Sequence, residues 1–396
     1  MIAAGNESVE AAGNSTYGGG LLFPPYVRAA YILLCVVILG IGVVGNVMVP
    51  LVIVKTKDMR NSTNIFLINL SVADLMVLLV CTPTVLVEVN SEPLIWVLGE
   101  EMCKAVPFVE LTVAHASVLT ILAISFERYY AICQPLRAGY VCTKARAMLI
   151  CLIAWAFAAL FTSPVLMVSE FREEEYFDGT NVTTCLMEAN EFWTSFYFTM
   201  STTVFFCLPL AILVGLYTVI ARNLLSNHGL VAPNNQSAAL RYRRQVVMML
   251  GTVVISFFIC LLPFKAFTLY VIYAPPEILL SMGIETFYNI LYICRMMFYI
   301  NSAINPILYN LMSSKFRDGF RKLLGISNHG NFARKGTVTT TTTLTSSAKT
   351  SSSDNLLRRS VVRVISLDEA SRVDNGLSTT IKLLNNSIVR SDESYV

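Results

Sequence analysis

The chain has 396 residues, of which 55% are hydrophobic, and its mean hydropathy is +0.61. These values exceed what the core of a water-soluble protein requires, so the surplus apolar side chains must face an apolar environment. The formal net charge of +3 is informative only through its distribution along the chain, and we expect no nucleic-acid partner.

Seven apolar runs are long enough to cross a lipid bilayer, which takes about 20 mostly apolar helical residues because lipid offers no partners to the backbone. They cover residues 27–54, 64–87, 103–132, 145–168, 193–224, 245–273 and 284–311. The sequence therefore predicts an all-α membrane protein, a seven-transmembrane helix bundle. No basic start with a small-residue cleavage site precedes Val27, so we expect the first span to direct insertion.

The loops between the predicted spans differ in charge. Cations follow spans one, three and five, at Lys55, Lys57, Arg60, Arg137, Lys144, Arg146, Arg222, Arg241, Arg243 and Arg244. The opposite loops are acidic, at Glu88, Glu92, Glu100, Glu101, Glu170, Glu173, Glu174, Glu175 and Asp178. Because Lys and Arg stay on the cytoplasmic side of short loops, we expect a multi-pass plasma-membrane protein with its N-terminus outside and its C-terminus in the cytoplasm.

The segments outside the bundle have distinct compositions. Residues 1–26 predict a disordered extracellular tail, and the sequons at Asn6, Asn14 and Asn181 predict glycosylation. Residues 27–312 form the predicted bundle, and residues 313–325 predict an amphipathic helix on the inner membrane surface, with Phe316, Phe320, Leu323 and Leu324 on one face.

Residues 326–396 predict a disordered cytoplasmic tail, because 337–353 are almost all Thr and Ser. Phosphorylation there could add dense negative charge for a cationic partner, and a solvated tail without function is the alternative. The terminus Ser394, Tyr395 and Val396 matches the pattern that PDZ domains capture. A chance match explains so short a pattern just as well.

Two of the ten cysteines lie at the predicted outer face of the bundle. Cys103 opens span three at the outer face, and Cys185 lies in the long outer loop before span five. Both are in an oxidising compartment, so we predict a disulfide that ties this loop across the outer mouth of the bundle.

Polar residues inside the spans are few and costly, which makes them candidates for function. Asp74, Ser117, Asn301, Ser302 and Asn305 lie at mid-bundle depth, together with Asn46. Their oxygens and one carboxylate could surround a sodium ion. A water-filled polar network joining the helices is an equally good explanation. We expect no other cofactor.

Charged, aromatic and proline residues near the inner half predict a bundle that moves. Glu127, Arg128 and Tyr129 end span three at the cytoplasmic boundary, where a carboxylate can hold a guanidinium and release it. Successive spans carry Pro209, Pro263 and Pro306, with Tyr217 and Tyr309 toward the inside. One proline usually marks a passive break, but three on neighbouring helices favour a rearranging bundle.

Opposite charges converge near the outer face. Glu110 lies about two helical turns below Cys103, and Lys265 and Arg295 lie outward of Pro263 and Pro306. These groups could bind a ligand, or Glu110 could pair with Arg295 or Lys265 and only join helices. With the acidic outer loops, including Glu88, they favour a basic peptide. Four aromatic residues could line the apolar part or simply pack, namely Phe298, Tyr299, Tyr292 and Tyr270. His115 is interpreted as a buried packing residue.

The motifs together resemble those of rhodopsin-like (class A) G-protein-coupled receptors, over about residues 27–324. The markers are Gly45-Asn46-Val47, Leu70 to Asp74, Trp96 to Gly99, Cys103, Glu127-Arg128-Tyr129, Trp155, Pro209 with Tyr217, Pro263, and Asn305 to Tyr309. Within that class, residues 106–120 and 125–133 are similar to arthropod ecdysis-triggering-hormone receptors. Receptors for thyrotropin-releasing hormone, neuromedin U and ghrelin look like the next neighbours.

The resemblance implies roles for these residues and partners for the chain. It implies the Cys103–Cys185 bridge, a sodium site around Asp74, and an activation switch at Arg128, Tyr217 and Tyr309. It also implies an amidated, Arg-containing peptide ligand, a heterotrimeric G protein that raises cytosolic calcium, and arrestin binding through the phosphorylated tail. One position departs from the family pattern, because Leu261 stands where most relatives have Trp. Phe257 is therefore expected to carry more of the rearrangement.

Other classes of membrane protein fit less well. A retinal pump needs a Lys in span seven, and residues 284–311 contain none. A hydrolase needs paired acids or a His cluster, and the chain has three His. We therefore expect no enzymatic activity and no catalytic residues. A seven-helix transporter, or a receptor for a small non-peptide ligand, remains the alternative, although we find no internal repeats typical of transporters.

Overall fold

The computed structural model describes residues 2–3, 23–176, 179–188, 191–226 and 236–325. Predictions for Asn6, Asn14, the hydroxyl-rich stretch 337–353 and the terminus Ser394 to Val396 fall outside these described residues. Backbone contacts divide the chain into two units, Met1–Asn331 and Phe332–Val396. All the structure described below belongs to the first unit.

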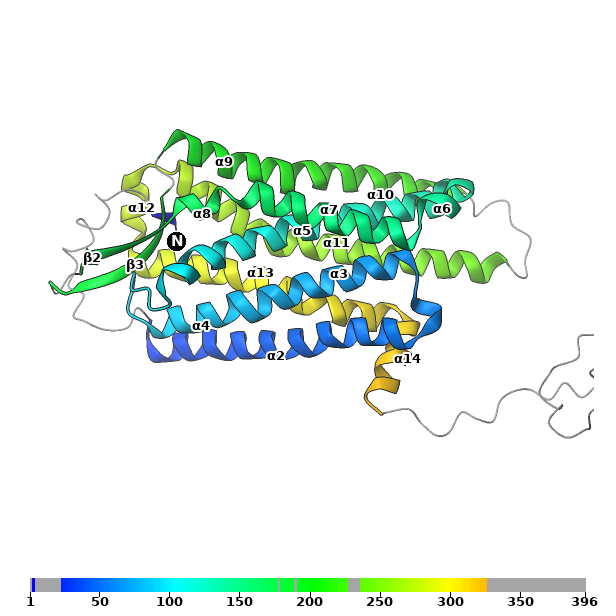
Figure 1. The fold of residues 1–396 in the computed structure, drawn as a ribbon, viewed down its shortest axis with the longest axis horizontal. Coiled ribbons are helices and arrows are strands. Elements are labelled where there is room, and N and C mark those ends of the chain that lie inside the picture. Colours follow the sequence, from blue (N-terminus) through cyan, green and yellow to red (C-terminus); the bar gives the residue numbers. More distant parts are fainter. Residues whose placement is uncertain (1, 4–22, 177–178, 189–190, 227–235, 326–396) are drawn as a thin grey trace, which may run out of the picture. The chain divides into compact units, whose positions relative to one another are not determined.

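Seven long helical segments lie side by side in this unit (Figure 1). In chain order they are α2 (Pro25–Lys55), α3 (Ser62–Met76) with η2 (Val77–Cys81) and α4 (Thr82–Asn90), α5 (Gly99–Cys133), α7 (Lys144–Thr162) with α8 (Val165–Val168), α9 (Phe192–Thr202) with η3 (Thr203–Cys207) and α10 (Leu208–Ser226), α11 (Gln236–Tyr273), and α13 (Ile284–Met312). Shorter helices are η1 (Lys57–Met59), α6 (Pro135–Val141), α12 (Pro276–Met282) and α14 (Ser314–Leu323). The predicted all-α, seven-helix bundle is confirmed.

Six of the long segments in the described chain are apolar and long enough to cross a membrane. The seventh, α13, has 29 residues but is not among the six. Its lower apolarity has a clear cause, since it carries Arg295, Asn301 and Asn305, all of which are buried. The polar side chains face the other helices, so α13 needs its neighbours to satisfy them.

Apolar side chains cover the outside of the bundle, and polar side chains of the spans lie inside it. Leu33 and Val44 of α2 are exposed, whereas Asn46 of the same helix is fully buried. The helices also approach closely, because a Cβ added to Gly45 would lie 2.7 Å from Cβ of Pro306. Small residues at a helix contact and an apolar exterior are typical of helices that pack within lipid.

Two π-helical turns interrupt otherwise regular spans, η2 in the second and η3 in the fifth. A π turn inserts one residue and rotates everything beyond it around the helix axis. In the second span, Asp74 precedes this turn and Glu88 follows it. The direction of Glu88 is therefore set by a local feature that hydrophobic periodicity does not show.

A small sheet covers one end of the bundle. Strands β2 (Ser169–Glu175) and β3 (Asn181–Glu188) form an antiparallel hairpin in which Phe171 pairs with Cys185. Residues Ile2–Ala3 form β1, which pairs in parallel with Met187 and Glu188 of β3. Part of the N-terminal segment thus joins the sheet, where the sequence predicted an unstructured tail.

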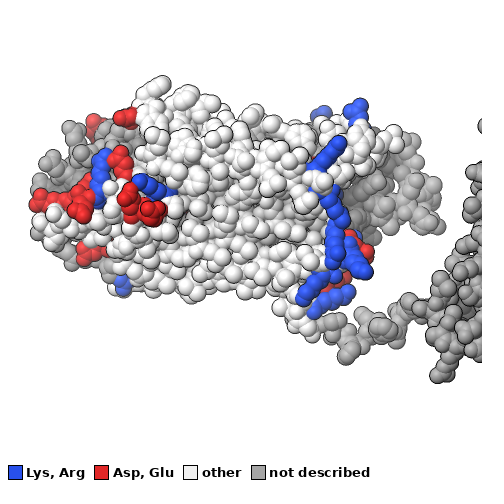
Figure 2. Space-filling model, in the orientation of Figure 1, with Lys and Arg blue, Asp and Glu red and all other residues white. Residues whose placement is uncertain are grey.

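Charged side chains gather at the two ends of the described bundle (Figure 2). Acidic residues cluster at the end with the hairpin, and Lys and Arg form a band at the end with α14, with a largely uncharged surface between them. Helix α14 buries Phe316 and Phe320 and leaves Arg317 and Arg321 exposed. A Cβ on Gly319 would lie 2.3 Å from Cγ1 of Val52, so this glycine lets α14 lie against α2.

Candidate functional site

A cavity that is partly open to solvent lies beneath the hairpin. Its walls come from α4, α5, α9, α11, α13 and β3, and all four charged residues predicted for the ligand site line it. They are Glu88, Glu110, Lys265 and Arg295. Residues far apart in the sequence therefore meet in one space.

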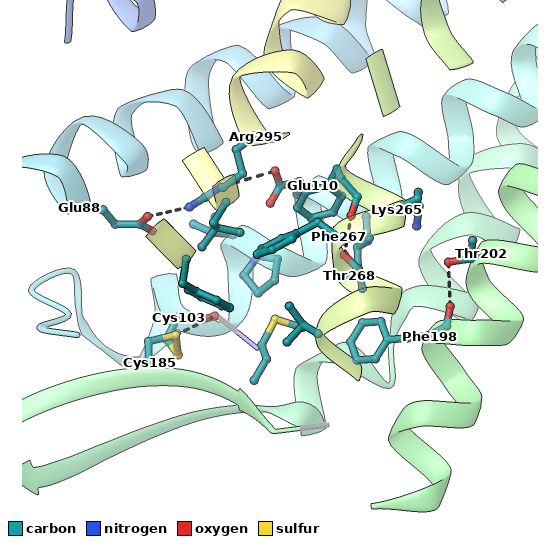
Figure 3. A pocket seen from close by; sticks show the side chains of 18 of the residues that line it. Glu88, Cys103, Glu110, Cys185, Phe198, Thr202, Lys265, Phe267, Thr268 and Arg295 are labelled. Atoms are coloured by element: carbon teal, nitrogen blue, oxygen red, sulfur yellow. Dashed lines mark hydrogen bonds and ion pairs between the residues drawn. A yellow bond between two sulfur atoms is a disulfide. The ribbon is translucent and has the colours of Figure 1, made fainter. Parts of the chain in front are cut away.

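Arg295 is the centre of the charge cluster and lies between two carboxylates (Figure 3). Its Nη1 donates to Oε2 of Glu88 at 2.7 Å, while its Nε is 4.0 Å from Oε1 of Glu110. The sequence suggested Glu110 as the partner of Arg295, and the structure shows Glu88 in the closer contact. At 4.0 Å, Nε of Arg295 and Oε1 of Glu110 are too far apart to form a hydrogen bond.

Lys265 lines the same cavity with a side chain that is only 6% exposed. Within the described part of the chain it forms no ion pair, so the proposed Glu110–Lys265 contact is not made. A buried ammonium without a carboxylate partner is costly. The cavity therefore contains one well-paired cation and one unpaired cation.

The aromatic residues predicted for the apolar wall lie elsewhere. Phe298, Tyr299, Tyr292 and Tyr270 are absent from the cavity lining. Tyr299 is fully buried and donates to the carbonyl oxygen of Cys81 at 3.4 Å, so it packs between helices. The wall is instead formed by Phe198, Phe264, Phe267, Phe287 and several aliphatic residues. Phe264, Phe267 and Thr268 lie within three residues of Lys265 on α11, and that proximity is the sequence signal that could have found them.

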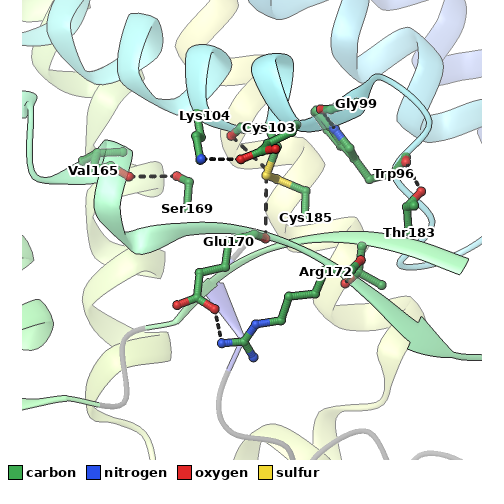
Figure 4. The surroundings of a disulfide bond; sticks show 12 residues. Trp96, Gly99, Cys103, Lys104, Val165, Ser169, Glu170, Arg172, Thr183 and Cys185 are labelled. Atoms are coloured by element: carbon green, nitrogen blue, oxygen red, sulfur yellow. Dashed lines mark hydrogen bonds and ion pairs between the residues drawn. A yellow bond between two sulfur atoms is a disulfide. The ribbon is translucent and has the colours of Figure 1, made fainter.

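A disulfide between Cys103 and Cys185 joins α5 to β3, as predicted (Figure 4). Beside it, the backbone N–H of Trp96 donates to the carbonyl of Thr183 at 2.8 Å, and the Thr183 hydroxyl donates to the Trp96 carbonyl at 2.7 Å. The hairpin is thus attached to the bundle by one covalent bond and a pair of hydrogen bonds. These contacts hold it over the cavity mouth.

At mid-bundle depth, Asp74 is surrounded by amides and hydroxyls. Asn305 donates to its Oδ2 at 3.0 Å, and Asn46 donates to the carbonyl of Ser302 at 2.8 Å. Asn301 and Ser117 are also buried. Side-chain carbonyl oxygens of Asn46, Asn301 and Asn305 have no hydrogen-bond partner within the described chain. The cluster is rich in unused acceptors, which suits a cation or waters.

The predicted switch residues lie near the opposite end. Glu127 accepts a hydrogen bond from Ser62 through Oε1, and its Oε2 is 3.8 Å from Nη2 of Arg128. The rings of Tyr129 and Tyr130 pack edge to face, and Tyr129 is half-buried. The hydroxyls of Tyr217 and Tyr309 are buried without a partner in the described chain. These hydroxyl groups could therefore form hydrogen bonds in another arrangement of the helices.

His115 is buried in a polar bridge between three helices. Its Nδ1 is 2.9 Å from Oγ1 of Thr162, its Nε2 is 3.0 Å from Oγ of Ser201, and its ring stacks on Phe205. The packing interpretation is therefore incomplete, since the ring also connects α5 to α7 and α9. The sequence did not indicate this bridge, because the hydroxyl groups that contact His115 lie on other helices.

Comparison with known proteins identifies the family. Residues 45–309 match the 7 transmembrane receptor (rhodopsin family). The thyrotropin-releasing hormone receptor of Gallus gallus is 34% identical over 327 residues, covering 75% of this chain and 80% of the relative. The growth hormone secretagogue receptor type 1 of Mus musculus is 35% identical over 320 residues, covering 78% and 84%. The chain belongs to the rhodopsin family of seven-transmembrane receptors.

Leu261, where the resemblance led us to expect Trp, is part of the core of this receptor. Leu261 is 3% exposed and lies one turn from Phe257 and Phe258, whose rings meet edge-on. Pro263 follows two residues later within the unbroken α11. The core below the cavity is therefore aliphatic at Leu261 and aromatic one turn deeper.

Proposed function

We propose that the chain is a cell-surface receptor for an extracellular peptide, and that it passes the binding event to a heterotrimeric G protein. The cavity lined by two carboxylates and two cations carries this proposal. Its lining combines apolar side chains with a few convergent charged groups, which is typical of ligand pockets. Two relatives are named as receptors for thyrotropin-releasing hormone and for a growth hormone secretagogue, which supports a hormone-like ligand.

The ligand in this proposal is basic and amidated at its C-terminus, like the hormones of ecdysis-triggering-hormone receptors. The acidic hairpin residues Glu173, Glu174 and Glu175 would attract such a peptide toward the cavity mouth. A terminal carboxamide combines a donor and an acceptor. It could therefore donate to Glu110 and accept from Lys265 without adding a net charge to the buried site.

The proposed orientation puts the hairpin outside the cell and α14 in the cytoplasm. The band of Lys and Arg at the α14 end supports it, because such residues are retained on the cytoplasmic side. The exposed Asn181 would then be open to glycosylation. Peptide binding at the outer end would act on Arg128 at the cytoplasmic end through movement of the helices that connect the two sites.

Transmission in this proposal rests on the contacts around Arg128. Release of Arg128 from Glu127 would free the guanidinium for the G protein or for the phenols of Tyr217 and Tyr309. Pro263 and Pro306 lie between the cavity and these groups on α11 and α13. A change in the Arg295 pairing could reach the inner end along α13. We further propose that the G protein raises cytosolic calcium.

Three additional partners belong to the proposal. A sodium ion would bind Asp74 with oxygens from Ser117, Asn301, Ser302 and Asn305. Arrestin would bind the phosphorylated Thr- and Ser-rich tail, and a PDZ domain would capture the C-terminal Ser394, Tyr395 and Val396. The last two concern residues outside the described structure.

The test is calcium release in cells that express the receptor and are exposed to a panel of amidated basic peptides and their free-acid forms. We expect at least one amidated peptide to act, with the acid form weaker by tenfold or more. Glu110→Gln should reduce potency, and Glu100→Gln, which removes an exposed carboxylate paired with Lys104, is the matched control. Arg128→Ala should abolish the calcium response while radiolabelled peptide still binds.

Other outcomes would contradict the proposal. Substrate uptake or ion current that persists without G protein would indicate a transporter. A response to small amines with none to any peptide would indicate a receptor for a small ligand. Unchanged signalling by Arg128→Ala would remove that residue from the switch.

A further inference from the structure

The polar bridge at His115 adjoins the ligand cavity without being part of its lining. Leu111, one helical turn earlier on α5, lines the cavity, and so does Thr202, the residue after Ser201 on α9. His115 and Ser201 themselves are buried. A ligand that moves the cavity wall at Thr202 therefore acts on the bridge through the backbone of α9, without touching the imidazole ring.

The hydrogen atoms of the bridge can be placed from its partners. The Thr162 hydroxyl lies 2.7 Å from the carbonyl oxygen of Ala158, and a carbonyl has no hydrogen, so the hydroxyl donates to it. Thr162 is then the acceptor in its 2.9 Å contact with Nδ1 of His115, which means that Nδ1 carries a hydrogen.

The other ring nitrogen is an acceptor. His115 pairs with no carboxylate among the described residues, and a buried imidazolium without such a partner is costly, so the ring is neutral. The Ser201 hydroxyl therefore donates to Nε2, at 3.0 Å. The hydroxyls of Thr202 and Thr203 instead donate to carbonyl oxygens of their own helix. A directed chain of hydrogen bonds thus runs from α9 through α5 to α7.

The same ring contacts the π-helical turn η3 of the fifth span. It stacks on the ring of Phe205, with ring centroids 3.8 Å apart and an interplanar angle of 22°. His115 thereby holds Ser201, just before the turn, and Phe205, within it. A π turn contains one residue more than an α turn, and one residue corresponds to about 100° of rotation about the axis of an α-helix. Displacement of the turn would rotate Thr202 relative to α10.

We propose that His115 is a positioning residue that holds the π turn of the fifth span in the resting arrangement and releases it when a ligand displaces α9. The inference rests on the proposed function, because it assumes that a ligand in the cavity contacts Thr202 or its neighbour Phe198. Movement of α9 away from α5 breaks the hydrogen bond from Ser201, and the turn keeps only its stacking contact. The fifth span continues through α10 to Tyr217, so its rearrangement reaches the predicted switch.

Nitrogen-15 NMR of the full-length receptor in lipid nanodiscs, with the histidine rings labelled, tests the hydrogen-bond chain. The sequence contains three histidines, and the signals that are missing from His115→Phe identify those of His115. Without ligand, we expect a neutral ring with its hydrogen on Nδ1. A hydrogen on Nε2, or a charged ring, would overturn the chain and with it the proposal.

Basal calcium release, normalised to the amount of receptor at the cell surface, tests the role of the bridge. Ser201→Ala removes the donor and Thr162→Val the acceptor, each with little change of shape, and both should raise basal signalling threefold or more. Thr203→Val is the matched control on the same span, because its hydroxyl bonds only within its own helix, and it should leave basal signalling unchanged. Thr162→Ser, the conservative variant that keeps the acceptor, should restore the wild-type value.

The outcomes separate this proposal from the proposed function. A bridge with a purely structural role would lower the thermal unfolding midpoint of Ser201→Ala and Thr162→Val without changing basal signalling per receptor. That result, in cells that respond to an active peptide, would refute the positioning role and leave the receptor function intact. Absence of calcium release with every peptide and every variant would refute the proposed function and the positioning role together, and the NMR signal would still decide whether the bridge exists. If one variant does not reach the cell surface, the other end of the chain decides.

Discussion

The outer charge cluster and the mid-bundle cluster handle buried charge in different ways. In the outer cluster, Glu88 and Glu110 face Arg295, so the carboxylates are compensated mainly by a cation from the protein itself. At mid-bundle, the partners of Asp74 among the described residues are neutral, and Asn305 donates a hydrogen bond to it. In the first cluster the protein itself supplies the positive charge, whereas the second leaves a negative charge that a mobile cation or a proton would balance.

Removing the central cation should have the largest effect. Arg295→Ala leaves Glu88 and Glu110 buried without a positive partner, and loss of one member of a buried pair costs about 3–5 kcal/mol. We expect a much lower thermal unfolding midpoint and little receptor at the cell surface. Arg172→Ala is the control, since Arg172 is more exposed and pairs with Glu170 on the hairpin. Equal stability of both variants would mean that the outer cluster does not depend on Arg295.

Close packing beside the mid-bundle cluster should give the next largest effect. Gly45→Ala brings a methyl group to 2.7 Å from the Pro306 ring, and such overpacking costs about 1–3 kcal/mol. Gly40→Ala, on the same helix with nothing within 4 Å, should be neutral or stabilising. Thermal unfolding of the two variants tests the comparison directly. A Gly45→Ala receptor as stable as Gly40→Ala would show that the α2–α13 contact yields easily.

The sodium dependence should be the smallest effect and the most diagnostic. If a cation binds Asp74, sodium at ten times its Kd stabilises the receptor by about 1.4 kcal/mol relative to the same concentration of a large organic cation. Asp74→Asn should remove this difference. Glu110→Gln should keep it, because Glu110 belongs to the outer cluster. Loss of sodium dependence in Glu110→Gln alone would place the ion in the outer cavity.

The sequence predicted the features that depend on local composition. The seven apolar runs correspond closely to the helices, because spanning lipid imposes both length and apolarity. The disulfide was predicted from the positions of Cys103 and Cys185 relative to the spans. The face of α14 that buries Phe316 and Phe320 also followed from helical periodicity.

The partners of polar side chains were predicted less well. Glu110 was proposed as a partner of Arg295, but Glu88 makes the shorter contact. The π turn at Val77–Cys81 rotates the segment that carries Glu88, and such a turn has no signature in the apolar pattern. Tyr299 and Phe298 were expected at the cavity and are buried between helices instead. The sequence does not show which face of the helix an aromatic residue turns toward the cavity.

By itself, the sequence determined that the chain crosses the membrane as seven helices, which residues lie at each depth, and which few polar groups are buried there. Depth follows from counting residues at 1.5 Å per residue along a helix that lipid forces to form its own hydrogen bonds. Only the tertiary structure decided which side chains meet, that Arg295 lies between Glu88 and Glu110, and that Lys265 has no ion pair with any described residue. Those contacts depend on rotation about each helix axis and on packing between helices, which are set by residues distant in the chain.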